Sequence, residues 1–448
     1  MLISCRQDWT IIRNKEIMID KSEREQIINL INYEVVPAIG CTEPIAVALC
    51  VSKATELLGK RPESIDVLLS ANILKNAMGV GIPGTDMMGL PIAIALGSII
   101  GKSEYGLEVL KDSNPKAVEE GKKMIDQNII NISLKSKIKE KLYIEVICKE
   151  EGNFSKAIIC SGHTNFVYLC RNDEVFLDKK KSVSKCYEST DVKLNLKKVY
   201  DFATTTPLDE IRFILESGRM NMSAAERSLN GSYGHELGKI LRNSSSKDSF
   251  LGSNTFSNIL SYTSAACDAR MGGAMIPVMS NSGSGNQGIT ATLPVVIYAH
   301  DKIKSEEELT RALILSHLTV IYIKQSLGRL SALCGCVVAA TGSSCGITYL
   351  MGGDYIKISY AVQNMIANIT GMICDGAKPS CALKLASGVS TAIFSAILAM
   401  EGKCVTSVEG IIDTDVDKSI QNLTTIGTIG MNETDKVVLD IMTHKHCD

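Results

Sequence analysis

The residues best suited to chemistry are five cysteines that lie between Gly328 and Lys384. Their neighbours are mostly small, as the segments GRLSALCGCVVAATGSSCG and GMICDGAKPSCALK show. Small side chains let the backbone approach a bulky inorganic group, and iron–sulfur clusters are held by cysteine thiolates. The segment contains no Cys-x-x-Cys pair, so its spacing does not fit a zinc ribbon. A cluster or metal site is one interpretation, and a set of buried core thiols is the other. The five cysteines are Cys334, Cys336, Cys345, Cys374 and Cys381.

Another cysteine, Cys41, lies in the segment GCTEP at residues 40–44. Pro44 suits the first turn of a helix, and the apolar run that follows extends to Gly59, which can end it. Cys41 is therefore expected at or just before a helix N-terminus, where the helix dipole and free amides lower the pKa of a thiol. The alternative is that Cys41 is a core residue and Glu43 an ordinary acid of the first helical turn.

The segment GSGNQG at residues 283–288 formally matches the dinucleotide-binding pattern G-x-G-x-x-G. That pattern requires a preceding strand inside a βαβ unit, whereas the surroundings here predict a helix, a loop and a second helix. We therefore reject the dinucleotide interpretation. The residues from Ser282 to Asn286 instead precede a helix start and offer several backbone N–H groups to an anion. A substrate carboxylate is the natural occupant.

The elements that must position these residues divide the chain into three parts. Residues 18–105 and 194–448 carry helical periodicity, whereas residues 106–193 contain alternating segments such as KLYIEVICKE, SKAIICSG and TNFVYLCRND. This alternation predicts half-buried antiparallel strands. We therefore expect an α+β fold, in which a small α/β domain (106–193) is inserted into a mainly helical catalytic domain (18–105 and 194–448). His163, between two strands, is a candidate to face a ligand, although an exposed turn histidine is the commoner case.

Composition narrows the functional classes. At 448 residues the chain is long enough for two or three domains, and its 47 basic residues nearly balance its 49 acidic ones. No basic run with interleaved aromatic residues is present, which argues against nucleic-acid binding. Fifteen cysteines in a long chain without a secretory signal favour a reducing compartment, so we expect a cytoplasmic protein with free thiols.

Two further expectations concern the membrane and the ends of the chain. The longest apolar runs, Leu90–Ile100 and Ala386–Met400, are shorter than the ~20 residues that a transmembrane helix needs, so we expect no membrane span. Residues 1–17 have no apolar signal region and look like a poorly ordered extension before a natural start near Met18. The tail MTHKHCD places His444, His446 and Cys447 together, where they could bind a metal, but such tails usually have no function.

Five motifs together resemble the iron–sulfur L-serine dehydratase alpha-chain family, most closely its single-chain L-cysteine desulfidase branch, which also carries the label UPF0597. The resemblance implies that Cys334, Cys374 and Cys381 bind a 4Fe-4S cluster and leave one iron open to substrate. It also implies that Cys41 accepts the α-proton of the substrate. The motifs are GCTEP at 40–44, LKNAMGVGIPGT at 74–85, SNSGSGNQG at 280–288, GRLSALCGC at 328–336 and GMICDGAK at 371–378.

An open iron of this kind is a Lewis acid rather than an electron carrier. With a base nearby it suits β-elimination of an α-amino acid, and the resemblance favours L-cysteine, which would give pyruvate, ammonia and hydrogen sulfide. L-serine dehydration is the alternative, and a cluster-binding or zinc-binding protein without catalysis is another.

Pyridoxal phosphate on a lysine also stays open as the cofactor. The lysines are Lys75, Lys324, Lys378 and Lys384. The partner we expect is a small amino-acid substrate, with assembly into a homo-oligomer left open. The charged groups of the substrate would be held by Thr42, Glu43, Ser282, Gly283, Ser284, Gly285 and Asn286.

Overall fold

The computed structural model describes residues 19–136, 138, 140–179, 192–243 and 251–444. The expected extension at residues 1–17 and two members of the C-terminal tail, His446 and Cys447, lie outside these residues. The third member, His444, ends the last helix, α17 (Asn432–His444), where its exposed ring contacts Asp440 one turn earlier.

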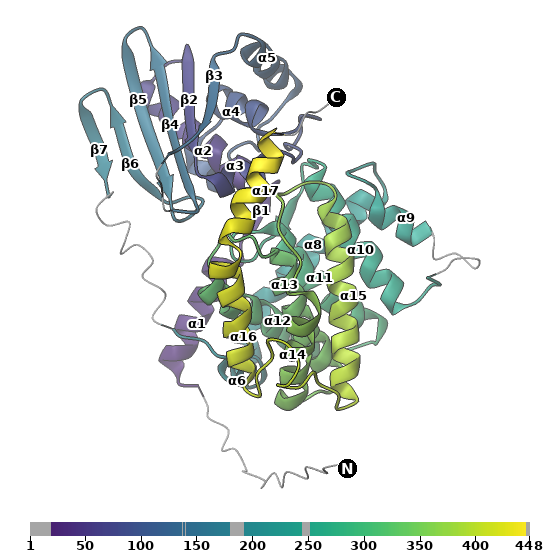
Figure 1. Cartoon of the computed structure of the whole chain (residues 1–448). Coiled ribbons are helices and arrows are strands. Elements are labelled where there is room, and N and C mark those ends of the chain that lie inside the picture. Colours follow the sequence, from purple (N-terminus) through teal and green to yellow (C-terminus); the bar gives the residue numbers. More distant parts are fainter. Residues whose placement is uncertain (1–18, 137, 139, 180–191, 244–250, 445–448) are drawn as a thin grey trace.

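The larger part of the molecule is a body of helices packed around α13 (Gly335–Leu350) (Figure 1). α13 is apolar or small on every side, which is the pattern of a helix buried all round. Gly346 allows a close approach, since a Cβ there would lie 2.9 Å from the carbonyl oxygen of Ala312 on a neighbouring helix. The neighbours are α11 (Gly285–Asp301), α12 (Glu306–Leu327), α14 (Tyr355–Ile369) and α15 (Cys381–Met400).

Further helices cover this core. α10 (Thr255–Met271) packs against α11 and α15, and α16 (Val416–Thr425) packs against α12 and α14. The outer elements are α1 (Lys21–Glu34), α6 (Leu196–Thr205), α7 (Leu208–Ile211), η3 (Arg212–Ile214), α8 (Leu215–Leu229), α9 (Leu237–Asn243), η4 (Ile426–Gly430) and α17.

The second part of the molecule is a six-stranded sheet with the strand order β3-β2-β4-β5-β6-β7. β2 pairs with β3 in parallel, and the other pairings are antiparallel. Alternate residues, such as Val67 and Val146, enter an apolar core shared with α2 (Thr42–Leu58) and α4 (Leu90–Ile99). The strands are β2 (Ser64–Leu69), β3 (Ile130–Leu134), β4 (Tyr143–Glu150), β5 (Asn153–Cys160), β6 (Phe166–Arg171) and β7 (Glu174–Asp178), and the connections include α3 (Ala71–Ala77), η1 (Ser103–Glu108) and α5 (Pro115–Asp126).

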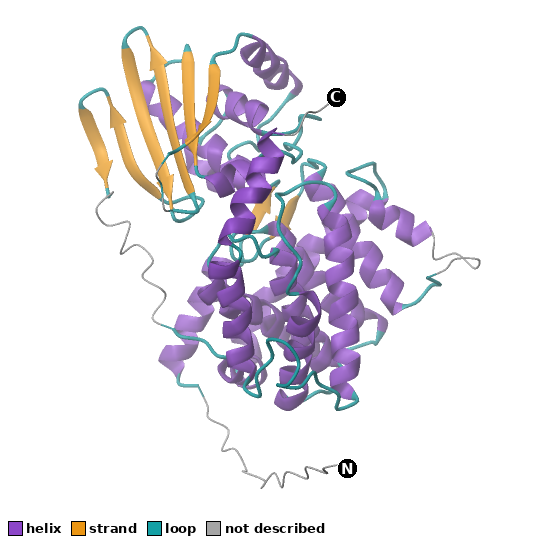
Figure 2. Ribbon diagram, in the orientation of Figure 1, coloured by secondary structure: helices purple, strands orange, loops and turns teal. Residues whose placement is uncertain are grey.

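The predicted fold class, a mainly helical α+β protein, is confirmed (Figure 2). The three alternating segments form β4, β5 and β6, which pair antiparallel as predicted. The sheet also draws on residues before position 106, because β2 lies inside it and α2 and α4 pack against it. The domain boundaries at 105/106 and 193/194 themselves stay a prediction.

A short two-stranded sheet brings two distant segments to one place. β1 (Pro37–Ile39) pairs antiparallel with β8 (Pro277–Met279), and the pairing continues in a hydrogen bond of 2.9 Å from the Ser280 N–H to the Val36 carbonyl oxygen. In Figure 2 these strands lie between the six-stranded sheet and the helical body. The segment after β1 and the loop after β8 therefore start side by side.

One helix among the described residues, α15, is long and apolar enough to cross a membrane by length and composition alone. The sequence-based expectation placed its start at Ala386, whereas the helix begins at Cys381 and has 20 residues. In the structure α15 packs against α10, α13 and α14. Core helices of this length pass the same test of length and composition.

Candidate active site

The first part of the site is the N-terminus of α2, which follows β1 directly. Gly40 adopts a φ of +71°, and a Cβ there would lie 2.5 Å from the ring of Pro83, so the turn requires glycine. Cys41 is the N-cap of α2, as the sequence predicted, and it is buried. Its thiol donates a hydrogen bond of 2.9 Å to Oε2 of Glu43. The turn therefore fixes a thiol and a carboxylate side by side.

The expected lowering of the Cys41 pKa is wrong. Burial and the charge of Glu43 raise the pKa of the Cys41 thiol well above its ordinary value, and Arg270 offsets this only in part. Desolvation disfavours the thiolate more than the helix N-terminus favours it. Burial also acts to raise the pKa of Glu43, but His163, the Cys41 thiol and Arg270 together bring it below the usual value. The pair therefore rests as a protonated thiol and a carboxylate.

His163 is buried and interacts electrostatically with Glu43, rather than being exposed in its turn between β5 and β6. A Cβ on Gly283 would lie 3.0 Å from its ring, so the β5–β6 turn reaches the loop after β8. Burial lowers the pKa of His163 to about 4, so the ring is neutral at neutral pH. The positive charge that balances Glu43 near neutral pH then comes from Arg270.

The second part of the site is the loop after β8. Ser282 and Gly283 adopt φ values of +49° and +79°, which turn the chain sharply before α11. Ser284 is the N-cap of α11, where its hydroxyl accepts a hydrogen bond of 3.4 Å from the Gln287 N–H. The Thr42 hydroxyl donates to the Gly283 carbonyl oxygen over 2.7 Å. That bond ties the loop to the N-terminus of α2.

A buried histidine on α12 holds the base of this loop. The Asn281 amide donates to Nδ1 of His317 over 3.0 Å, and Nε2 of the same ring lies 2.9 Å from the Thr292 hydroxyl. Because that hydroxyl already donates to the Gly288 carbonyl oxygen, Nε2 carries the proton and donates. Burial lowers the pKa of His317 to about 3, so this arrangement is neutral. Asn281 in turn accepts a hydrogen bond of 2.8 Å from Ser282.

The third part of the site brings three distant cysteines together. Residues 332–334 run antiparallel to residues 372–374, with a hydrogen bond of 3.0 Å from the Cys334 N–H to Met372 and one of 2.6 Å from the Cys374 N–H to Ala332. Cys334 is the N-cap of α13, and Cys381 is the first residue of α15. Two of the three thiols therefore stand at helix N-termini, where anionic groups are favoured.

All three parts line one cavity of about 90 Å³. The thiols assigned to a cluster open into it, and so does Cys41. Ser284 and Asn286 of the predicted substrate loop line the cavity, whereas Ser282, Gly283, Gly285 and Thr42 form the turns behind it. The full lining is Cys41, Glu43, Asn76, Arg270, Ser284, Asn286, Gln287, Cys334, Gly335, Cys336, Cys374, Gly376, Ala377, Cys381, Lys384 and Leu385.

The chemistry of this donor set fits an iron–sulfur cluster. Burial and the neighbouring Cys374 thiol raise the pKa of Cys334 to about 12, and burial also raises the pKa of Cys381. Crowded buried thiols are costly to ionise without a cation, and a bound metal reverses that preference. Within the described ranges, no three His, Cys, Asp or Glu side chains converge where a single metal ion would bind. Cluster ligands bind separate iron atoms and do not need to converge on one point.

Two other cysteines of the central segment were predicted not to bind the cluster. Cys336 lines the cavity, but its thiol donates a hydrogen bond of 3.1 Å to the Lys384 carbonyl oxygen. Cys345 is buried further along α13 and does not line the cavity. Their exclusion from the ligand set stays a prediction.

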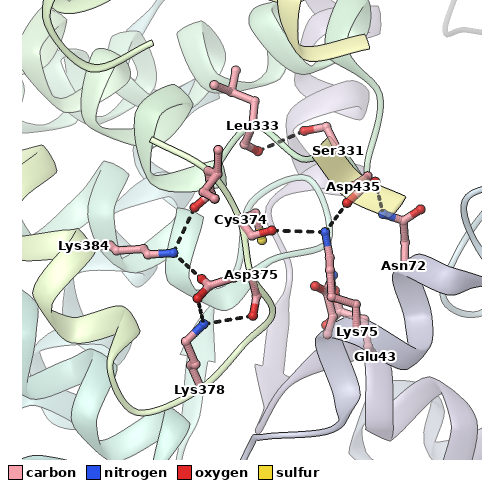
Figure 3. Close-up of polar contacts among 12 residues, drawn as sticks. Glu43, Asn72, Lys75, Ser331, Leu333, Cys374, Asp375, Lys378, Lys384 and Asp435 are labelled. Atoms are coloured by element: carbon pink, nitrogen blue, oxygen red, sulfur yellow. Dashed lines mark hydrogen bonds and ion pairs between the residues drawn. The ribbon is translucent and has the colours of Figure 1, made fainter. Parts of the chain in front are cut away.

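A buried ion pair supports the segment that carries Cys374 (Figure 3). Lys75 on α3 donates to the Cys374 carbonyl oxygen over 3.2 Å and forms an ion pair with Asp435 on α17. Asn72 donates to the same carboxylate over 2.6 Å. The C-terminal helix is therefore tied through Lys75 to a predicted cluster ligand.

The other lysines considered for a Schiff base also have polar partners. Lys378 and Lys384 both form ion pairs with Asp375, as Figure 3 shows. Lys324 donates to the Arg329 carbonyl oxygen over 2.9 Å, and burial lowers its pKa to about 8. Of the four lysines, Lys384 alone lines the cavity. None of them presents an unengaged amine there.

We expect Lys75→Met to lower the free energy of unfolding of the metal-free chain by about 3 kcal/mol, because it leaves the Asp435 carboxylate without its cation. Denaturant unfolding followed by circular dichroism measures the change. Lys436→Met is the control, since its ion pair with Glu433 on the same helix is exposed and should matter by at most about 0.5 kcal/mol. Equal effects of the two substitutions would contradict a supporting role for Lys75.

Sequence reasoning missed two polar residues of the cavity wall, Arg270 and Gln287. Arg270 lies in the segment SAACDARMGG, among small residues of a helix with no polar face. Arginine is almost never fully buried unless it is paired, so an arginine in such a helix could have indicated a functional residue. Gln287 lies in the motif SNSGSGNQG, but the predicted substrate loop ended at Asn286, one residue earlier. Asn76, in the motif at 74–85, also lines the cavity.

Comparisons with known proteins give a consistent result. The model of the family described as serine dehydratase alpha chain matches residues 104–440. A UPF0597 protein of Phocaeicola vulgatus is 77% identical over 432 residues, which cover 96% of this chain and 100% of the relative. A UPF0597 protein of Bacteroides thetaiotaomicron is 69% identical over 425 residues, 95% of this chain and 99% of the relative. A UPF0597 protein of Clostridium perfringens is 44% identical over 426 residues, which cover 94% of this chain and 99% of the relative.

Proposed function

Because the chain belongs to the serine dehydratase alpha chain family, we propose that it is a lyase that uses a 4Fe-4S cluster for β-elimination from an L-amino acid. The proposed substrate is L-cysteine, which would give pyruvate, ammonia and hydrogen sulfide. L-serine is the second candidate, because serine dehydration is the activity that the matched family is described by.

The observation that carries the proposal is the composition of one cavity wall. Three thiols from separate segments, a thiol–carboxylate pair and a guanidinium group all line the same space. Cys345, which is buried inside α13, does not line this space. A wall of thiols and opposite charges suits a metal cluster and a small charged substrate held next to each other.

In this proposal Cys334, Cys374 and Cys381 hold the cluster, whose open iron would supply a Lewis acid toward the leaving group. Cys41 and Glu43 take up the α-proton. At rest the Cys41 thiol keeps its proton and donates a hydrogen bond to the Glu43 carboxylate, so the carboxylate must accept that proton before the sulfur can act as a base. Ser284 and Asn286 face the substrate, and Thr42 keeps their loop in place.

The bonds that break are Cα–H and Cβ–S. The α-proton goes to the Cys41–Glu43 pair, and the electrons of the Cα–H bond form the Cα–Cβ double bond while the sulfur leaves with its own bonding pair. The sulfur leaves as hydrosulfide and takes up the proton held by the Cys41–Glu43 pair, which restores the pair. The products are 2-aminoacrylate and hydrogen sulfide. Aminoacrylate tautomerises to an imine, and water hydrolyses the imine to pyruvate and ammonia.

The test is a substrate screen with the full-length chain after anaerobic reconstitution with iron and sulfide. L-cysteine, L-serine and L-threonine are supplied in turn, and 2-oxo acid, ammonia and sulfide are measured. We expect pyruvate, ammonia and sulfide in equal amounts from L-cysteine, with no product from the metal-free chain. A higher kcat/KM for L-serine would assign the dehydratase activity instead. A reconstituted cluster without any 2-oxo acid product would contradict a catalytic role.

A further inference from the structure

The cavity wall contains a buried guanidinium group whose end has no partner among the described residues. Arg270 is only 2% exposed, and its Nε donates to the Gly40 carbonyl oxygen over 3.1 Å. In the part of the chain that the structure describes, its two terminal nitrogens make neither a hydrogen bond nor an ion pair. A buried, unpaired charge is costly, so such a group calls for an anionic occupant.

The backbone around Arg270 is built to let it reach the cavity. A Cβ on Gly285 would overlap the guanidinium group, so the first residue of α11 has no room for a side chain. The Gly40 carbonyl oxygen accepts the hydrogen bond from Nε. The guanidinium therefore lies between the two turns that carry Cys41 and Ser284, and Arg270 lines the cavity. An arginine fork of this kind suits a carboxylate, which it can bind through two parallel hydrogen bonds.

The same cavity contains buried acceptors that lack a donor. Asn76 Oδ1 and Gln287 Oε1 are both buried without a hydrogen-bond partner within the described residues. Their orientation is set by the other end of each amide: Asn76 Nδ2 donates to Glu43 over 3.0 Å, and Gln287 Nε2 donates to the Asn281 carbonyl oxygen over 3.5 Å. The Glu43 carboxylate faces the cavity beside them. A group with several N–H donors would satisfy this side.

We propose that Arg270 binds the α-carboxylate of the substrate, while Glu43, Asn76 and Gln287 receive its α-ammonium group. Arg270 and Glu43 line one cavity without forming an ion pair with each other in the described chain, so a zwitterion can lie between them. A simple acid would leave the acceptors unsatisfied, and a simple amine would leave Arg270 unpaired. The site therefore selects free α-amino acids. This inference deepens the proposed function, on which it rests for the reaction that follows binding.

Three probes that cannot react separate the two contacts. L-alanine carries both charged groups, propionate lacks the ammonium and ethylamine lacks the carboxylate. Their binding to the full-length chain is measured by calorimetry on the metal-free protein, and by competition with L-cysteine turnover after reconstitution. We expect L-alanine to bind about 10- to 100-fold more tightly than either fragment, since a hydrogen-bonded charge is worth about one to two decades of affinity.

Arg270→Met should weaken L-alanine and propionate binding by about 10- to 100-fold and leave ethylamine unchanged. Arg270→Lys keeps the positive charge but cannot form two parallel hydrogen bonds, so its affinity for L-alanine should lie between those of the unchanged protein and Arg270→Met. This variant provides the test if Arg270→Met does not fold. Arg311→Lys is the matched control, because Arg311 is half buried outside the cavity and donates to the carbonyl oxygens of Ala203 and Thr206. It should bind L-alanine as the unchanged protein does.

Unchanged L-alanine binding in a folded Arg270→Met or Arg270→Lys chain would overturn the inference, and so would equal loss of all three probes. Arg270-dependent binding of L-alanine without pyruvate formation from any amino acid would keep the inference and reject the proposed function. Pyruvate formation with a KM that Arg270→Met does not change would keep the proposed function and reject the inference.

Discussion

Serine at any one of Cys334, Cys374 and Cys381 should prevent stable cluster binding and reduce turnover by at least about 100-fold. Removing a group that merely supports a metal ligand already costs about 10- to 100-fold in metal affinity or activity, so loss of a direct ligand should cost more. Iron and sulfide content per chain and the visible absorption after anaerobic reconstitution measure cluster binding. Circular dichroism of the metal-free variants checks that the fold is kept.

The controls for this experiment are the other two cysteines of the segment. Cys336→Ser keeps a hydroxyl that can donate to the Lys384 carbonyl oxygen, as the thiol does over 3.1 Å. Cys345 lies inside α13 away from the cavity. Both variants should bind iron normally. Loss of iron in Cys336→Ser, together with retention in one of the first three, would show that the ligand set is wrong.

The start of α2 could be predicted because its signals are local. Gly40 and Pro44 bracket the N-terminus, and the left-handed Gly59 ends the helix, so Cys41 falls at the N-cap. The direction of its pKa shift could not be predicted in the same way. It depends on burial and on the charges of Glu43 and Arg270, and Arg270 comes from a helix more than two hundred residues later.

The strands of the sheet could likewise be predicted from local sequence, whereas their full order could not. Alternation of apolar residues predicted β4, β5 and β6, because each strand has one face against a core. The place of β2 between β3 and β4 could not be read from that pattern, since β2 pairs with β3 in parallel across a long connection. The predicted insert therefore starts at residue 106, whereas the sheet already includes β2.

The cavity wall was only partly visible in the sequence. The separation of Cys334 from Cys374 along the chain indicates nothing until residues 332–334 pair with 372–374, so their grouping rested on the family resemblance. His163 was a candidate to face a ligand, with an exposed turn histidine as the commoner case. In the structure it is buried, and its ring lies against Gly283. Such contacts arise from the docking of the sheet on the helical body, which no local motif encodes.

Cys41→Ala should keep near-normal iron content and lose about 10²- to 10⁴-fold in kcat, the range that general-base participation usually contributes. The Cys41 variant should also stop exchanging the α-proton of the substrate with deuterated solvent, which mass spectrometry of recovered amino acid measures. Cys50→Ala is the matched control, because Cys50 is buried on the same helix and its thiol faces the Ala157 carbonyl oxygen at 3.4 Å. It should retain both exchange and turnover. Native exchange in Cys41→Ala would assign the base elsewhere, and loss of iron would make Cys41 a ligand.

Glu43→Gln separates the two tasks of the thiol–carboxylate pair. The charge of Glu43 raises the pKa of Cys41, so its removal should lower that pKa. A lower pKa means more thiolate at a given pH, and alkylation of Cys41 by iodoacetamide in the metal-free chain should become faster at pH 8. Turnover should nevertheless fall, because the carboxylate that accepts the thiol proton is gone. Faster alkylation with unchanged turnover would show that Cys41 acts without Glu43. Slower alkylation would contradict the electrostatic account of the pair, since only a partner that stabilises the thiolate could have been lost.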